Sequence, residues 1–149
     1  MELNGETLRF IREHCKDDVR SLALQAPKYP GVDMSVALTQ IAGRQAAAEK
    51  IPSWHEEEGV LYPRHLSLEQ CSSEATARYK ASIIPESSSG TLTDLTGGFG
   101  IDCAFLSPKF HHVTYVERQE VLCEIASHNF PLLGLNHIQI ENKDGIRHL

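Results

Sequence analysis

The segment Asp94-Leu-Thr-Gly-Gly-Phe-Gly100 decides the fold class of this chain of 149 residues. Residues 91–95 are apolar and β-branched, which predicts a short buried strand, and a helix is predicted over residues 102–107. A glycine turn between a strand and a helix lets a ligand approach bare backbone, since glycine has no Cβ. In nucleotide-binding α/β domains this turn lies at the carboxyl end of a strand, where the ligand binds. The segment therefore predicts a nucleotide-type site.

The residues that follow continue an α/β pattern. Strands are predicted over residues 113–116 and 137–140, and a helix over residues 119–133. The order strand, turn, helix, strand, helix, strand predicts a parallel sheet. Because doubly wound sheets usually have five or more strands and three are found here, we expect the chain to be the front part of a longer protein.

The first half of the chain is helical in pattern. Apolar residues at helical spacing predict one amphipathic helix, or two short ones, over residues 7–24. A second helix is predicted from its N-cap Asp33 to the residue before Pro52. Residues 52–66 are expected to be a connector, and their acidic run at residues 56–58 a solvated surface.

A third helix is predicted within residues 68–83. It begins either at a capping box formed by Ser67 and Gln70 or at a cap supplied by Ser72 or Ser73. A serine-rich linker at residues 87–90 follows. The predicted fold class is therefore α/β, with a helical N-terminal domain (residues 1–86) and the first half, β-α-β-α-β, of a Rossmann-like sheet (residues 87–149).

Composition limits the classes of function. The formal net charge is −6, which argues against strong non-specific phosphate binding by the chain as a whole. The four cysteines form no C-x-x-C pair, which indicates reduced thiols in a cytoplasmic protein and neither a zinc site nor a disulfide framework. No apolar run is long enough for a membrane span, so no membrane partner is expected. Because the cysteines lack the spacing of metal ligands, no metal is expected either. The oligomeric state is left open.

Two cofactors compete for the glycine turn. The nicotinamide fingerprint G-x-G-x-x-G has its first two glycines at Gly98 and Gly100 but Cys103 in place of the third, and Cys103 is expected to be a small core residue. Asp94 lies four residues before Gly98, where its carboxylate would repel a pyrophosphate but attract a cationic sulfonium. The turn therefore favours S-adenosylmethionine. A nicotinamide-dependent oxidoreductase and a non-catalytic helical interaction module remain the alternatives.

Two more acidic residues follow strands. Glu117 comes 23 residues after Asp94, close to the spacing of about 20 at which a carboxylate accepts both ribose hydroxyls. Asp144 follows the third strand and could accept a hydrogen bond from an adenine amino group. Each residue has a simpler interpretation: Asp94 as a turn or cap residue, Glu117 as a solvated charge, and Asp144 as an Asx turn. Trp54 and Tyr62 are expected to pack in the core, with stacking on a base as the alternative.

The glycine segment, together with Glu117, resembles motifs I and II of class I S-adenosylmethionine-dependent methyltransferases. The form without glycine two residues after Asp94 is similar to that of RNA cap guanine-N2 methyltransferases (trimethylguanosine-synthase-like enzymes), in which a preceding helical segment closes over the cofactor. The stretch Gln70-Cys-Ser-Ser-Glu74 resembles their Ser-x-Thr-Pro-Glu motif, with Ser72 at the Thr and Gln70 at the Ser. The resemblance implies this set of cofactor-binding residues: Gln70, Ser72, Asp94, Thr96, Gly97, Gly98, Gly100, Glu117, Arg118 and Asp144.

Residues 22–81 also resemble the N-terminal part of bacterial RNA methyltransferase-like proteins that carry a THUMP-like region further on. This resemblance implies methyl transfer to a tRNA or rRNA base. In amino-methylating relatives an Asn/Asp-Pro-Pro-aromatic catalytic loop follows the fourth strand, and no such tetrapeptide occurs in this sequence. No catalytic residue is therefore predicted, and the chain is expected to carry only the cofactor-binding half of the enzyme and to be inactive alone.

Overall fold

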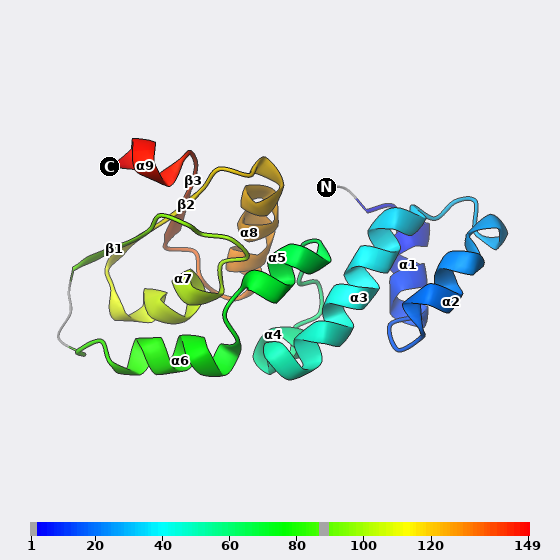
Figure 1. Cartoon of the computed structure of the whole chain (residues 1–149), viewed down its shortest axis with the longest axis horizontal. Coiled ribbons are helices and arrows are strands. Elements are labelled where there is room, and N and C mark those ends of the chain that lie inside the picture. Colours follow the sequence, from blue (N-terminus) through cyan, green and yellow to red (C-terminus); the bar gives the residue numbers. More distant parts are fainter. Residues whose placement is uncertain (1–2, 87–89) are drawn as a thin grey trace.

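The computed structural model describes residues 3–86 and 90–149. The molecule is elongated, with a group of short helices at one end and a sheet at the other (Figure 1). The long helix α3 (Met34–Lys50) runs between the two ends. The linker predicted at residues 87–90 falls almost entirely outside the described residues.

The helical end begins with α1 (Gly5–Glu13) and α2 (Val19–Leu24), so the prediction of two short helices is confirmed. Each helix has a polar N-cap whose side chain accepts a backbone N–H, Asn4 for α1 and Asp18 for α2. A short 3₁₀ turn over Ala26–Lys28 leads to α3, which Asp33 caps as predicted by accepting from the Val36 N–H.

Of two predictions for residues 52–83, one is wrong and one is confirmed in its second alternative. The expected connector contains the helix α4 (Pro52–Glu56), which begins at a proline because the first helical position needs no N–H donor. The expected third helix is α6 (Glu74–Ser82), which starts at the Ser73 cap, and a separate short helix, α5 (His65–Gln70), precedes it. Extended backbone at Cys71 and Ser73 separates them, and Ser73 caps α6 by accepting from Thr76. Because serine competes for backbone hydrogen bonds, the pair Ser72-Ser73 favours this break.

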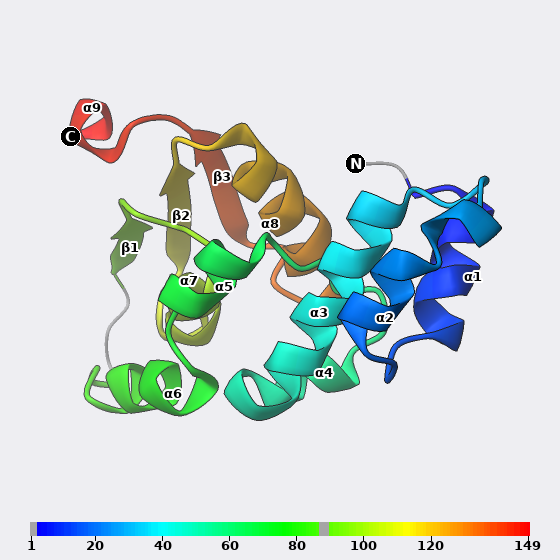
Figure 2. The ribbon, with the colours of Figure 1, turned by 45° about the vertical axis from the view of Figure 1, so that its right-hand side comes forward.

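The sheet has three parallel strands in the order β1-β2-β3, which confirms the predicted β-α-β-α-β pattern. They are β1 (Thr91–Asp94), β2 (His112–Glu117) and β3 (Ile138–Asn142), and Figure 2 shows them side by side. The connections contain α7 (Ile101–Leu106), a 3₁₀ turn over Ser107–Lys109, and α8 (Glu120–Leu132). A last helix, α9 (Gly145–His148), follows β3.

Strand β1 is less buried than the sequence predicts. Thr91 and Thr93 are exposed, and only Leu92 and Asp94 are partly covered. Within the described residues β1 pairs with β2 alone, so it is an edge strand. The apolar and β-branched composition of residues 91–95 indicates a strand but cannot show whether its second edge and second face are covered.

One core cluster extends across residue 86. Trp54 and Tyr62 are 3% and 1% exposed, as expected for core residues, and both rings pack against Phe99 at centroid distances of 5.1 and 5.9 Å. The same cluster contains Tyr115 of β2 and Phe130 of α8. A separate cluster, formed by Phe10, Leu22, Ala37 and Ile41, holds the helical end together. The domain boundary at residue 86 stays a prediction.

The segment before α5 is held on both sides by buried carboxamides. Gln40 of α3 donates to the Tyr62 carbonyl at 2.9 Å and accepts from the Tyr62 N–H at 2.8 Å. Asn129 of α8 makes the same pair of contacts with Leu61, both at 2.8 Å. These side chains replace the neighbouring strands that an extended segment would otherwise need, and they fix α8 against α3.

Candidate functional site

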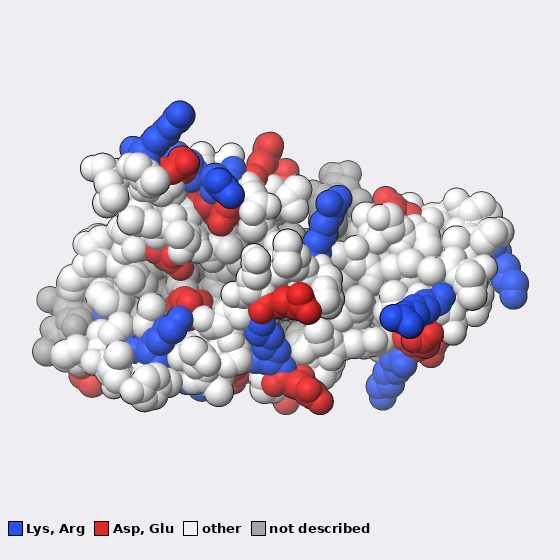
Figure 3. Space-filling view, in the orientation of Figure 1, with Lys and Arg blue, Asp and Glu red and all other residues white. Residues whose placement is uncertain are grey.

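A cavity of about 720 Å³ lies at the carboxyl ends of the strands, between α5 and α9. Its volume is within the range of small-molecule sites, roughly 300–1,000 Å³. Figure 3 shows acidic side chains gathered in the hollowed area between the positions of α9 and α6. All ten residues that the sequence singled out line this one cavity: Gln70, Ser72, Asp94, Thr96, Gly97, Gly98, Gly100, Glu117, Arg118 and Asp144.

Asp94 is the last residue of β1 and points into the cavity. Its Oδ1 accepts a hydrogen bond from the Thr96 N–H at 3.1 Å, so it also has the turn-forming contact that the simpler interpretation expects. Burial raises the pKa of this carboxyl, and the negative charges of Asp102 and Glu117 raise it further. A buried carboxylate surrounded by other carboxylates is costly to ionise unless a cation lies beside it.

Glu117 is the last residue of β2 and is only 8% exposed. Its Oε2 accepts from the Gly98 N–H at 2.9 Å, and its Oε1 accepts from the Gln119 N–H at 2.8 Å. The interpretation of Glu117 as a solvated charge is therefore wrong. Each carboxylate oxygen has a second lone pair, so two further donors, such as a pair of vicinal hydroxyls, can bind the same group.

The glycines are required for a different reason from the one that the sequence suggested. A Cβ at Gly97 would lie 2.3 Å from the ring of Tyr115, whose hydroxyl donates to the Gly98 carbonyl at 2.5 Å. Gly100 has a φ of +91° and a Cβ there would lie 2.8 Å from the ring of Phe130. Packing against two aromatic rings below the loop, rather than ligand approach alone, demands glycine at these positions.

Four amide N–H groups of this loop already have acceptors. Thr96 donates to Asp94 and Gly98 donates to Glu117, as described above. Gly97 donates to the Val116 carbonyl at 2.8 Å, and Gly100 donates to the Gly97 carbonyl at 2.9 Å. A phosphate-binding loop needs such groups free to point at the anion. Four of the loop amides are consequently not available to a pyrophosphate.

Asp144 joins α9 to the site. Its Oδ1 accepts from the Ile146 N–H at 2.9 Å and so caps α9, which is the local contact that the Asx-turn interpretation expects. Ile146 and Leu149 also line the cavity and are 84% and 91% exposed. They give the cavity an apolar wall on the side of α9, where a flat apolar group such as a purine base could pack.

Sequence reasoning missed a polar cluster on the opposite wall. Ser72 Oγ donates to Asp102 Oδ2 at 3.0 Å, and Lys80 Nζ of α6 lies 3.0 Å from the same oxygen. Asp102 Oδ1 is buried and has no hydrogen-bond partner among the described residues. An acidic residue in the first turn of a helix is common, so nothing in the sequence marks Asp102, and only the fold brings Lys80 to it.

The lining is acidic overall. It contains four carboxylates, Asp94, Asp102, Glu117 and Asp144, and a single cationic side chain, Arg118. No group of three or more His, Cys, Asp or Glu side chains in the described part of the chain is arranged to hold a metal ion. Among the helices of residues 3–86 and 90–149, none has the length and apolar character needed to cross a membrane.

Comparison with known proteins gives one informative likeness. No model of a known protein family matches the sequence, and no curated protein matches it. The fold is similar to the crystal structure of a protein of Porphyromonas gingivalis W83 described as a putative methyltransferase, with a TM-score of 0.71 and 29% sequence identity. The similarity covers 89% of this chain and 33% of that protein, so the chain spans a third of its length. The likeness supports a methyltransferase fold for this chain.

Proposed function

We propose that the chain binds S-adenosylmethionine in the cavity and orients it as a methyl donor. The observation that carries the proposal is the acidic lining, in which Asp94 and Glu117 end adjacent strands and accept from two amides of the glycine loop. This arrangement favours a ligand with positive charge and hydroxyl donors over one with a pyrophosphate. The methyltransferase likeness of the fold supports the same ligand.

The residues present fit the parts of this cofactor. Glu117 has lone pairs for the two ribose hydroxyls, and Asp94 has a carboxylate that a nearby cation would stabilise. Ile146 and Asp144 offer an apolar surface and a polar acceptor for an adenine ring. Gln70 and Ser72 face the cavity from the junction of α5 and α6. When bound, the cofactor supplies an electrophilic methyl group, and the contribution of this chain is to bind and orient it.

We extend the proposal to RNA as the methyl acceptor. Support comes from the segment of residues 70–74 and from residues 22–81, which resemble RNA methyltransferase-like proteins. The acceptor atom and the catalytic residues are not assigned, and the activity of the whole protein is part of this proposal.

Calorimetric titration tests the cofactor. We expect S-adenosylhomocysteine to bind the wild-type chain, and NADH not to bind. The Asp94→Asn variant keeps the acceptor for Thr96 but loses the charge, so its affinity for S-adenosylhomocysteine should fall. Its affinity for S-adenosylmethionine should fall by a larger factor, because that ligand carries the positively charged sulfonium. Asp33→Asn is the matched control, since Asp33 caps α3 far from the cavity. Binding of NADH in place of S-adenosylhomocysteine would sink the proposal.

A further inference from the structure

Three exposed arginines lie on or next to elements that line the cavity, and we propose that they hold the phosphates of an unpaired RNA strand whose base enters it. The residues are Arg64, Arg118 and Arg147, which together are called the arginine rim. The proposal rests on the proposed function, because it gives that same site its substrate-binding surface. It adds the face on which the substrate lies and the single-stranded form in which it binds.

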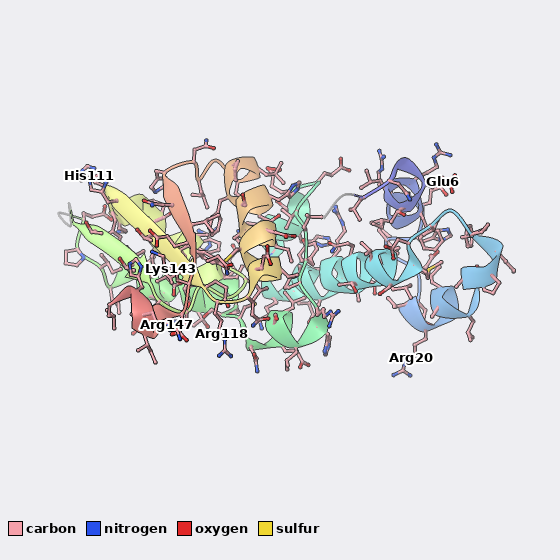
Figure 4. The ribbon with its side chains drawn as sticks, turned by 90° about the horizontal axis from the view of Figure 1, so that it is seen from above. Glu6, Arg20, His111, Arg118, Lys143 and Arg147 are labelled. Atoms are coloured by element: carbon pink, nitrogen blue, oxygen red, sulfur yellow. The ribbon has the colours of Figure 1, made fainter. Side chains whose placement is uncertain are left out.

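The rim residues lie at three elements that each contribute residues to the cavity lining. Arg118 directly follows β2 and lines the cavity. Arg147 lies in α9 between the lining residues Ile146 and Leu149. Arg64 directly precedes α5, the helix whose Ser67 and Gln70 line the cavity. In Figure 4, Arg118 and Arg147 project from the same side of the molecule.

The three guanidinium groups are available to an external anion. All three residues are exposed, and across residues 3–86 and 90–149 none of their side chains has an ion pair or a hydrogen bond. Lys143, which lies nearby in Figure 4, differs because it forms an ion pair with Glu141 at 2.6 Å. A guanidinium that has no carboxylate partner keeps its full charge and its forked donors, which match a phosphate.

The contrast between rim and interior favours a nucleotide strand. The carboxylates of Asp94 and Glu117 inside the cavity repel phosphate, so an anionic substrate must keep its phosphates outside. A nucleotide meets both requirements, because its uncharged base can enter the cavity while its phosphates, separated from the base by the ribose, stay at the rim. A base in a duplex cannot reach into a cavity without leaving the stack, so an unpaired strand is the form that fits. An acidic peptide would satisfy the rim but would present no flat, uncharged base to the cavity.

Fluorescence anisotropy with a fluorescein-labelled single-stranded RNA of mixed sequence, about 12 nucleotides long, tests the rim. The test variant is Arg64→Gln with Arg147→Gln, and Arg118 is kept because it lines the cofactor cavity. The matched control is Arg9→Gln with Arg20→Gln, which removes the same charge from the helical end, where Figure 4 places Arg20. We expect the rim variant to bind RNA at least about fivefold more weakly and to lose about 0.7 of salt slope per contact, while the control changes less than about twofold.

Other results of the same measurements would overturn the proposal or separate it from the proposed function. Equal weakening in both variants, or equal affinity for a duplex of the same length, overturns the proposal. Competition by poly-glutamate that depends on the same two arginines would assign the rim to an acidic protein and overturn it as well. Calorimetry with S-adenosylhomocysteine is run on each variant and should be unchanged. If the wild-type chain fails to bind S-adenosylhomocysteine while the rim still binds RNA, the proposed function fails and the rim stands.

Discussion

Asn129 of α8 carries a stability prediction that tests how the two ends of the molecule are joined. Its side chain is fully buried, and its carboxamide makes both of its hydrogen bonds to the Leu61 backbone at 2.8 Å. The substitution Asn129→Leu keeps the branching and the number of side-chain heavy atoms and removes both hydrogen-bonding groups. One buried N–H and one buried C=O then lose their hydrogen bonds.

The expected cost follows from those two groups. Leaving a buried polar group unsatisfied costs about 1–3 kcal/mol, and the added apolar burial of leucine offsets about 1–2 kcal/mol of the total. We therefore expect the free energy of unfolding to fall by about 2–4 kcal/mol, and Tm to fall by about 5–15 °C for a chain of this length. Urea unfolding followed by circular dichroism measures the first quantity, and a thermal melt measures the second.

Two further variants make the test specific. Asn136→Leu is the matched control, because Asn136 is exposed, and it should change stability by less than about 0.5 kcal/mol. Asn129→Asp keeps the acceptor for the Leu61 N–H but places a carboxylate against the Leu61 carbonyl. Its deficit relative to wild type should shrink as pH falls and the acid becomes a donor. The reasoning is refuted if Asn129→Leu loses no more stability than Asn136→Leu.

Three other outcomes are expected. Glu117→Gln can accept only one of the two N–H groups, so it should lose about 1.5–3 kcal/mol of stability and weaken S-adenosylhomocysteine binding in calorimetry; unchanged binding would exclude Glu117 from the ligand site. Because burial raises the pKa of Asp94, its ionisation costs stability above that raised pKa, and the cost vanishes below the unfolded value of 3.8, where the carboxyl is protonated in both states. Asp94→Asn should therefore raise the Tm of the ligand-free protein at pH 7 and lose that gain as pH falls to 3.8 and below, and an equal gain at both pH values would contradict this. Gly97→Ala should cost about 1–3 kcal/mol through overpacking against Tyr115, whereas Gly5→Ala, whose Cβ would meet nothing within 4 Å, should cost none.

The predictable part of the site consists of residues at the ends of strands. A strand pattern fixes where a strand stops, and parallel strands end at one edge of a sheet, so Asp94 and Glu117 could be expected to lie together. Local rules also predicted caps such as Asp33 and Ser73, because a cap interacts within three residues of itself. The sequence is sufficient wherever the partner is close along the chain.

Contacts between residues far apart in the sequence could not be predicted from local sequence patterns. Ser72 meets Asp102 across 30 residues, and Asn129 meets Leu61 across 68. None of these residue types is unusual where it stands, since serine at a helix end and acid in a first turn are ordinary. The exposure of β1 also escaped prediction, because burial depends on which neighbours a strand has and not on its own composition.

The core that runs across residue 86 has a practical meaning for anyone who expresses parts of this protein. Cutting there would separate Trp54 and Tyr62 from Phe99, the ring they enclose. The glycine loop would then lose the aromatic support on one side, and the severed α/β piece would carry an exposed apolar face prone to aggregation. A soluble binding fragment would have to keep Trp54 and Tyr62, and also α1 and α2, which cover Ala37 and Ile41 of α3. The change in sequence pattern at residue 86 is therefore a poor guide to where the molecule can be divided.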